Sequence, residues 1–199
     1  MIESYVRPIY QKIFCDPLAR VLGKSFSPNA LTFLGTLVGV VILPALYYDF
    51  INMALALLVI TGIFDTLDGT VARLFQKDSY LGTVFDIIGD RIVEFSIVLG
   101  LFLLSPETRA LGCLLMLGSI LICVTSFLVI GIFSKNESQK GFHYSPGLME
   151  RPEAFLFFAA MMLLPTLFSE LAFLFTFLVF LTAVIRVLEF KNKMNEINI

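Results

Sequence analysis

Residues 51–90 of the chain read INMALALLVITGIFDTLDGTVARLFQKDSYLGTVFDIIGD. An apolar run lasts from residue 51 to Phe64 and is followed at once by Asp65 and Asp68. After a short polar turn, a second mostly apolar segment carries Asp86 and Asp90 near its start. Because a bilayer core requires about 20 mostly apolar residues per helix, the stretch predicts two antiparallel membrane helices with acids at their joined ends.

The composition of the whole chain is that of a membrane protein. Of its 199 residues, 58% are hydrophobic and 15% are charged, whereas soluble domains are nearer half apolar and a quarter charged. No basic face lies outside the loops, so binding to nucleic acid is not expected. The three cysteines, two of them inside apolar runs, indicate small buried side chains rather than disulfides.

We predict an all-α integral membrane protein with six transmembrane helices, preceded by an amphipathic helix on the cytoplasmic surface. The expected membrane helices are 30–48, 51–75, 81–104, 110–133, 154–168 and 171–190, within a single domain 1–199 whose core covers residues 25–193. The segment 154–168 is long enough to span only if its helix begins near Gly147. In residues 1–24, Ile2, Val6, Ile9 and Ile13 recur at helical spacing until Pro17 interrupts the pattern.

The positions of lysine and arginine predict the orientation in the membrane. Of the 14 such residues, only Arg109 lies at the end of the helices away from the acids. The positive-inside rule therefore places both termini, the 134–150 loop and the acidic ends of the helices in the cytoplasm, and a bacterial inner membrane is the expected location.

The four aspartates are spaced so that they can gather at one point. Asp65 and Asp68 are three residues apart and Asp86 and Asp90 are four apart, so each pair shares a helix face. Carboxylates this close would repel one another and take up protons unless a divalent cation neutralises them. Oxygen ligands without nearby Cys or His favour Mg²⁺ or Mn²⁺, which proteins commonly bind together with substrate phosphates. The alternative is four acids that merely face water.

The neighbours of these acids fit a pyrophosphate ligand. Gly69 and Ala72 leave room for a ligand to approach the backbone at the same helix end. Arg73 follows and can donate two hydrogen bonds to a phosphate. Gly82 lies one turn before Asp86.

Together these residues resemble the signature of a known family, the CDP-alcohol phosphatidyltransferases. The resemblance is carried by Asp65-x-x-Asp68-Gly69-x-x-Ala72-Arg73 and, eight residues later, by Gly82-x-x-x-Asp86-x-x-x-Asp90. Ser27-Pro28-Asn29, where the first membrane helix begins, resembles a further family element. The resemblance implies an enzyme that transfers a phosphatidyl group from CDP-diacylglycerol to a small alcohol and releases CMP, and it suggests a homodimer.

The resemblance also implies a role for each matching residue. Asp65, Asp68 and Asp86 would bind divalent metal, with two ions expected, while Asp90 would complete the metal site and act as general base towards the alcohol. The residues implied for the CDP pocket are Asn29, Asp65, Asp68, Gly69, Ala72, Arg73 and Gly82.

The acceptor alcohol depends on residues outside the signature, and two acceptors stay open. Arg91, which follows the last aspartate, and residues 150–153 resemble the branch that uses inositol phosphate. That branch also carries basic residues along its fourth membrane helix, where residues 126–131 of this chain are apolar. A phosphatidylglycerophosphate-type acceptor is the alternative, although that branch usually has Lys after the last aspartate. The candidate acceptor contacts are Arg91, Arg151 and Lys135, with Lys140 as a further one.

One alternative belongs to a different functional class. A cation transporter also places acids within membrane helices. It would need acids near mid-bilayer on several helices, and it does not require Gly69, Ala72 or Arg73. A catalytically inactive lipid-binding relative would not need the complete signature. The sequence therefore favours phosphatidyl transfer.

Overall fold

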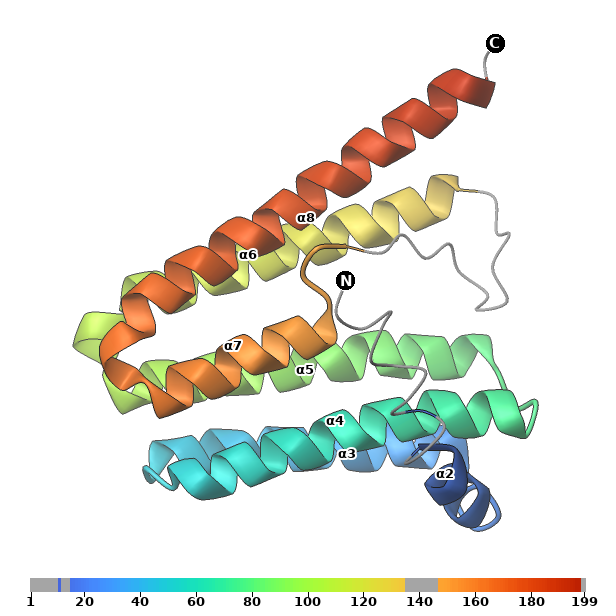
Figure 1. Cartoon of the computed structure of the whole chain (residues 1–199), viewed down its shortest axis with the longest axis horizontal. Helices are drawn as coiled ribbons and strands as arrows, with labels where there is room; N and C mark the ends of the chain where they lie inside the picture. The colour runs from blue at the N-terminus through green and yellow to red at the C-terminus, as the bar shows by residue number, and fades with distance from the viewer. Residues whose placement is uncertain (1–10, 12–14, 135–146, 198–199) are drawn as a thin grey trace. The chain divides into compact units, whose positions relative to one another are not determined.

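The computed structural model of the protein describes residues 11, 15–134 and 147–197 and is helical through most of them (Figure 1). The chain divides into two compact units at residues 104 and 105. The helices of the first unit are α2 (Asp16–Leu22), α3 (Pro28–Tyr47), α4 (Ile51–Leu74) and α5 (Tyr80–Leu104). Those of the second are α6 (Pro106–Phe133), α7 (Arg151–Leu163), the 3₁₀ turn η2 (Pro165–Leu167) and α8 (Phe168–Ile197).

The helical prediction is confirmed for the described residues, and four of their helical segments are long and apolar enough to cross a membrane. These are α3, α4, α6 and the segment Pro165–Asn195 that includes α8. The protein is therefore an integral membrane protein. The other two expected spans differ: α5 carries four charged residues among its 25, and α7 has 13 residues and begins at Arg151, not near Gly147.

The ends of α3 and α4 follow from local sequence. Ser27 caps α3 by accepting a hydrogen bond from the backbone N–H of Ala30 at 3.3 Å, and Pro28 occupies the first turn, where no backbone donor is needed. After each helix, one residue adopts a left-handed conformation, Asp49 with φ 59° and Gln76 with φ 53°. Such a residue reverses the chain while the last helical carbonyls remain hydrogen-bonded. The two turns return the chain so that α4 and α5 both pack against α3.

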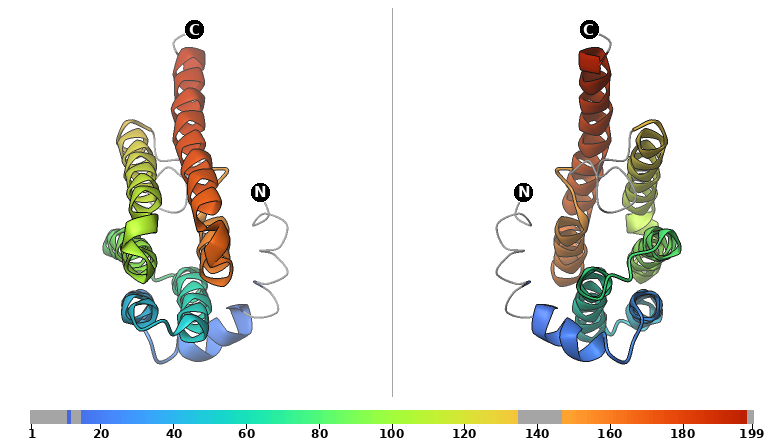
Figure 2. Two further views of the ribbon diagram at one scale, coloured as in Figure 1. Left: turned by 90° about the vertical axis from the view of Figure 1, so that its left-hand side faces the viewer. Right: turned by 90° about the vertical axis from the view of Figure 1, so that its right-hand side faces the viewer.

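Helix α3 packs along both α4 and α5 (Figure 2). Small residues permit the close approach: a Cβ added to Gly35 would lie 2.8 Å from Phe64 Cβ on α4, and Gly39 faces Val93 on α5. Gly100 of α5 meets Leu46 of α3 in the same way. The Gly35-x-x-x-Gly39 pair therefore serves packing inside the chain, one glycine for each neighbouring helix.

This packing predicts that Gly39→Ala destabilises the protein by about 1–3 kcal/mol, the usual cost of overpacking. The new methyl group would stand 2.9 Å from Val93 Cγ1 and 3.2 Å from Val93 Cβ, and a β-branched side chain has few rotamers into which it can retreat. Thermal unfolding in detergent would measure the loss. Gly118→Ala is the matched control, because no atom of the residues that the structure describes lies within 4 Å of a Cβ there. Equal stability of the two variants would contradict the account.

The N-terminal part of the first unit is anchored by α2. Ala19 of α2 is buried in a cluster with Leu31 of α3 and Leu67 and Val71 of α4. Pro17 lies in the first turn of α2, where its missing N–H costs nothing. The apolar stripe expected before Pro17 falls on residues outside the described ones.

In the second unit, α6 and α7 pack against α8. Phe158 of α7 and Phe175 of α8 are both buried, with ring centroids 5.5 Å apart. Gly112 of α6 lets α8 approach closely, since a Cβ there would be 3.1 Å from Ala172 Cβ. The backbone N–H of Met149, just before α7, donates to Thr182 Oγ1 on α8 at 3.0 Å, which ties the start of α7 to α8.

Candidate metal centre and nucleotide site

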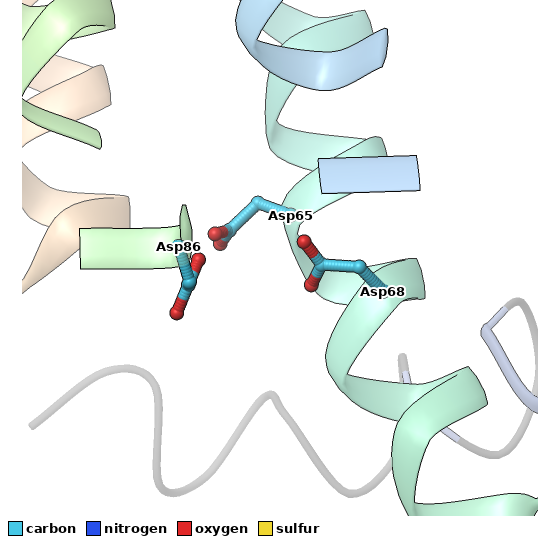
Figure 3. A group of neighbouring side chains, drawn as sticks. All are labelled: Asp65, Asp68 and Asp86. Atoms are coloured by element: carbon cyan, nitrogen blue, oxygen red, sulfur yellow. The ribbon is translucent and has the colours of Figure 1, made fainter. Parts of the chain in front are cut away.

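Three of the four aspartates meet at one point in the first unit. Each of Asp65, Asp68 and Asp86 offers a carboxylate oxygen, and these oxygens lie within 4.8 Å of one another. Figure 3 shows Asp65 and Asp68 reaching out from α4 and Asp86 approaching from α5. The i, i+3 spacing on α4 and the short turn before α5 produce this meeting, as the sequence predicts.

Asp68 is the most constrained member of the group. Its side chain is buried, with 7% of the residue exposed. Its Oδ2 accepts a hydrogen bond from Thr32 Oγ1 of α3 at 2.6 Å, and its Oδ1 accepts one from the backbone N–H of Gly69. These donors favour the ionised carboxylate and fix its orientation. The sequence does not single out Thr32 as a site residue. It lies on α3, three residues after Asn29, and α3 packs against both helices that carry the acids.

The chemistry of the group fits a hard divalent cation. All three donors are carboxylate oxygens from residues that are buried or half-buried, and no Cys or His belongs to the group. Without a cation, three negative charges at this spacing would repel one another strongly. Carboxylate-only sites of this kind suit Mg²⁺ or Mn²⁺, which retain positions for water or phosphate oxygens.

The hydrogen bond from Thr32 predicts a supporting role in metal binding. Thr32→Val removes the hydroxyl donor but keeps the branched shape, so Mn²⁺ affinity should fall by about 10–100-fold, as is typical when a group that orients a ligand is lost. Titration of Mn²⁺ followed by electron paramagnetic resonance measures this affinity. Thr61→Val is the matched control, because Thr61 is a buried threonine of α4 whose hydroxyl donates only to Leu57 O within its own helix among the described residues. Unchanged affinity in Thr32→Val would contradict the supporting role.

The residues expected to contact a nucleotide flank the acids on two sides. Among the described residues, a Cβ added to Gly69 would lie within 4 Å of Arg73 Nη1 alone, at 3.3 Å. Arg73 is exposed at the end of α4, and its Nη2 donates to Thr70 Oγ1 at 3.4 Å. Thr70 Oγ1 also accepts from Gln11 Nε2 at 2.9 Å. Ala72 is half-buried on the same turn.

On the other side, Asn29 and Gly82 lie against each other. Asn29 Oδ1 would be 2.9 Å from a Cβ on Gly82, so a side chain at this position would displace the Asn29 amide. The backbone N–H of Gly82 donates to Ser79 Oγ at 3.0 Å, which fixes the start of α5. The structure therefore joins two residues that are 53 positions apart and that the sequence assigns to one pocket.

Asp90 lies one helical turn beyond Asp86 on α5 and is not a member of the three-carboxylate group. Its Oδ2 is 3.9 Å from Arg91 Nη2. Arg91 in turn places Nη1 2.8 Å from Glu94 Oε2. Asp90 is thus set apart from the three clustered acids and stands beside a cation.

The remaining candidates belong to the second unit. Arg151 is the first residue of α7, and its guanidinium lies 5.3 Å from the centre of the Phe155 ring. Lys135 and Lys140 lie outside the described residues. Arg186 of α8, which sequence analysis does not single out, stacks over Phe127 at 5.3 Å and donates to Cys123 Sγ at 3.4 Å. A positive charge therefore accompanies the apolar run 126–131, supplied by another helix.

Comparison with known proteins places these residues in a family context. A model of the CDP-alcohol phosphatidyltransferase family matches residues 25–188. The inner membrane protein YnjF of Escherichia coli (strain K12) is 28% identical over 198 residues, which cover 94% of each chain. The phosphatidylinositol phosphate synthase of Mycobacteroides abscessus is 30% identical over 152 residues, covering 74% of this chain and 66% of that enzyme.

The fold is shared with a solved enzyme. The crystal structure of the Mycobacterium tuberculosis phosphatidylinositol phosphate synthase with CDP-DAG bound superposes with a TM-score of 0.72 at 22% identity, covering 87% of this chain and 92% of that one. The same enzyme in complex with manganese and citrate gives a TM-score of 0.73 at 21% identity, covering 89% and 88%.

Proposed function

Because the chain belongs to the CDP-alcohol phosphatidyltransferase family, we propose that it transfers a phosphatidyl group from CDP-diacylglycerol to a phosphate-bearing alcohol, inositol phosphate first among them, and releases CMP. The observation that carries this proposal is the meeting of Asp65, Asp68 and Asp86, whose carboxylate oxygens lie within 4.8 Å of one another. The protein is a transferase of phospholipid biosynthesis, which favours this function over cation transport.

The three clustered carboxylates hold the divalent cofactor, Mg²⁺ or Mn²⁺, and we propose two ions with Asp90 completing the site. A bound divalent cation neutralises the pyrophosphate and stabilises the charge that develops on departing CMP. Hydrogen bonds from Thr32 and from the Gly69 N–H hold the Asp68 carboxylate in a fixed orientation for this task. Asn29, Gly69, Ala72, Arg73 and Gly82 form the CDP pocket, in which Arg73 offers paired donors to phosphate oxygens.

Asp90 acts as the general base of the transfer. Its carboxylate takes the proton of the acceptor hydroxyl, whose oxygen forms a bond to the β-phosphorus of the donor. The bond between that phosphorus and the bridging oxygen breaks, and CMP leaves with the electron pair. A carboxylate base suits this role when it is within hydrogen-bond reach of the hydroxyl. Its position outside the three-carboxylate group supports this division of roles.

A phosphate-bearing acceptor is supported by the basic side chains near the acids and in the second unit. Arg91 follows Asp90 directly, and the named relative with 30% identity is a phosphatidylinositol phosphate synthase. Arg151, Lys135 and Arg186 are the proposed further contacts to the acceptor. Arg186 offers the positive charge that residues 126–131 themselves lack. A glycerol phosphate acceptor would be bound by basic side chains of the same kind, but no specific observation favours it.

The membrane arrangement completes the proposal. We expect α5 and α7 to join the four longer segments as six spans of one domain, with an amphipathic helix preceding them. Both termini and the aspartates face the cytoplasm of a bacterial inner membrane, as the distribution of lysine and arginine indicates. CMP can then leave into water while the lipid product stays in the bilayer. A homodimer is the assembly we propose.

An acceptor panel tests the function. Purified protein with Mn²⁺ and CDP-diacylglycerol is offered inositol phosphate, glycerol 3-phosphate, inositol and serine, and the rate of CMP release is measured for each. The proposal expects the highest kcat/KM with inositol phosphate and little release with the two acceptors that lack a phosphate. A preference for free inositol or serine would contradict the phosphate-bearing acceptor.

A further inference from the structure

Glu94 is a buried acid that the proposed mechanism does not use. It lies on α5, one turn beyond Asp90, and is 8% exposed. Its Oε2 is 2.8 Å from Arg91 Nη1. A buried charge in an apolar helix is costly even when it is paired, and an apolar residue would avoid that cost. The pair with Arg91 therefore explains how Glu94 is tolerated but leaves its purpose open.

The guanidinium of Arg91 is only partly satisfied by this pair. Its Nη1 faces Glu94, its Nη2 stands 3.9 Å from Asp90 Oδ2, and its Nε is buried without a hydrogen-bond partner among the described residues. Glu94 Oε2 likewise accepts no well-aligned hydrogen bond, so its contact with Arg91 is an ion pair. Buried donors are nearly always satisfied in folded proteins, and an exception at this position calls for a ligand or water.

The unsatisfied part of Arg91 has a defined shape. Nε and Nη2 lie on one edge of the planar guanidinium, and such an edge binds a phosphate or carboxylate through two parallel hydrogen bonds. Because Glu94 lies at Nη1, the edge left without a hydrogen-bond partner for its Nε is the one nearest Asp90. An oxyanion bound there would satisfy Nε and would bring its own alcohol next to the proposed base.

We propose that Glu94 is a positioning residue for the acceptor: it holds Arg91 by Nη1, so that the Nε–Nη2 edge receives the phosphate monoester of the acceptor beside Asp90. The inference rests on the proposed function and deepens it by assigning the acceptor phosphate to one edge of one side chain. It also explains why arginine follows Asp90, since the ammonium group of lysine has no such edge.

Steady-state kinetics separates this role from a purely structural one. CMP release is measured with Mn²⁺ and saturating CDP-diacylglycerol while inositol phosphate is varied, and then with donor and acceptor exchanged. For Glu94→Gln we expect the KM for inositol phosphate to rise about tenfold, which corresponds to the loss of about one charge-assisted hydrogen bond to the acceptor phosphate. We expect kcat and the KM for CDP-diacylglycerol to change by less than about twofold. Glu107→Gln, at an exposed acid near the start of α6, is the matched control and should match the wild type.

Two further variants keep the test decisive if Glu94→Gln does not fold. Glu94→Asp retains the charge with a shorter reach and should give an intermediate KM for inositol phosphate. Arg91→Lys retains the cation but removes the edge and should raise that KM at least as much as Glu94→Gln. An unchanged KM for inositol phosphate in the Glu94 variants, or equal rises for donor and acceptor, overturns the positioning role. A wild type that prefers acceptors without phosphate would instead overturn the proposed function itself.

Discussion

Asp90→Asn is expected to slow CMP release by about 10²–10⁴-fold, the usual contribution of a positioned general base. The side chain keeps its size and can still accept a hydrogen bond from the acceptor, but the amide cannot take up the proton. Asp90 lies outside the group formed by Asp65, Asp68 and Asp86, so those three acids should still bind the cation. The measurement is kcat for CMP release at saturating Mn²⁺, CDP-diacylglycerol and inositol phosphate.

The control for this variant separates the base from the metal site. Mn²⁺ affinity of Asp90→Asn should stay near that of the wild type or fall moderately, because the three clustered carboxylates remain. Asp78→Asn, at an exposed acid in the turn between α4 and α5, should leave both quantities unchanged. Near-normal kcat in Asp90→Asn would refute its role as base.

Asp68→Asn is expected to weaken Mn²⁺ binding by more than about a hundredfold and so to abolish metal-dependent activity. This loss of affinity is larger than the loss of about 10–100-fold that is typical when a residue that only orients a metal ligand is removed. Asp68 is the buried member of the cluster, and hydrogen bonds from Thr32 and Gly69 hold both of its oxygens in place. Its replacement therefore removes a ligand whose position no neighbouring acid can take over. Rates of CMP release over a Mn²⁺ titration measure the effect.

Thermal unfolding provides a readout of this effect that does not depend on turnover. A ligand present at a hundred times its Kd stabilises the folded state by about 2.7 kcal/mol, so added Mn²⁺ should raise the Tm of the wild type. The same addition should leave the Tm of Asp68→Asn almost unchanged, while Asp78→Asn should respond like the wild type. A full Mn²⁺ response in Asp68→Asn would show that the cation binds elsewhere.

The helices around the acids were predictable because their sequence limits are sharp. The expected helices 51–75 and 81–104 correspond to α4 (Ile51–Leu74) and α5 (Tyr80–Leu104). α4 is a mostly apolar run bounded by polar residues, for which a membrane allows few alternatives, and α5 begins directly after the polar turn that follows it. The spacing of the acids on these helices then predicted the contact between Asp65, Asp68 and Asp86, because helical periodicity and a short turn leave little freedom.

What sequence reasoning missed depends on tertiary contacts or on a local steric effect. Nothing in the sequence distinguishes Thr32 from other helix residues, because its hydrogen bond to Asp68 depends on how α3 packs against α4. The ion pair between Glu94 and Arg91 is a side-chain contact that their three-residue spacing on a helix permits but does not require. The start of α7 at Arg151 instead of near Gly147 has a steric cause: Pro152 fits the first turn of a helix but opposes helical structure in the residues before it.

The most direct test of the central claim is the stoichiometry of the reaction catalysed by the purified protein. Mn²⁺, CDP-diacylglycerol and inositol phosphate are supplied together, and CMP and the lipid product are quantified by mass spectrometry. Our account predicts one CMP for each phosphatidylinositol phosphate formed, with neither product after chelation of the metal. A folded protein that binds Mn²⁺ but forms no phosphatidyl product with any acceptor of the panel would contradict it.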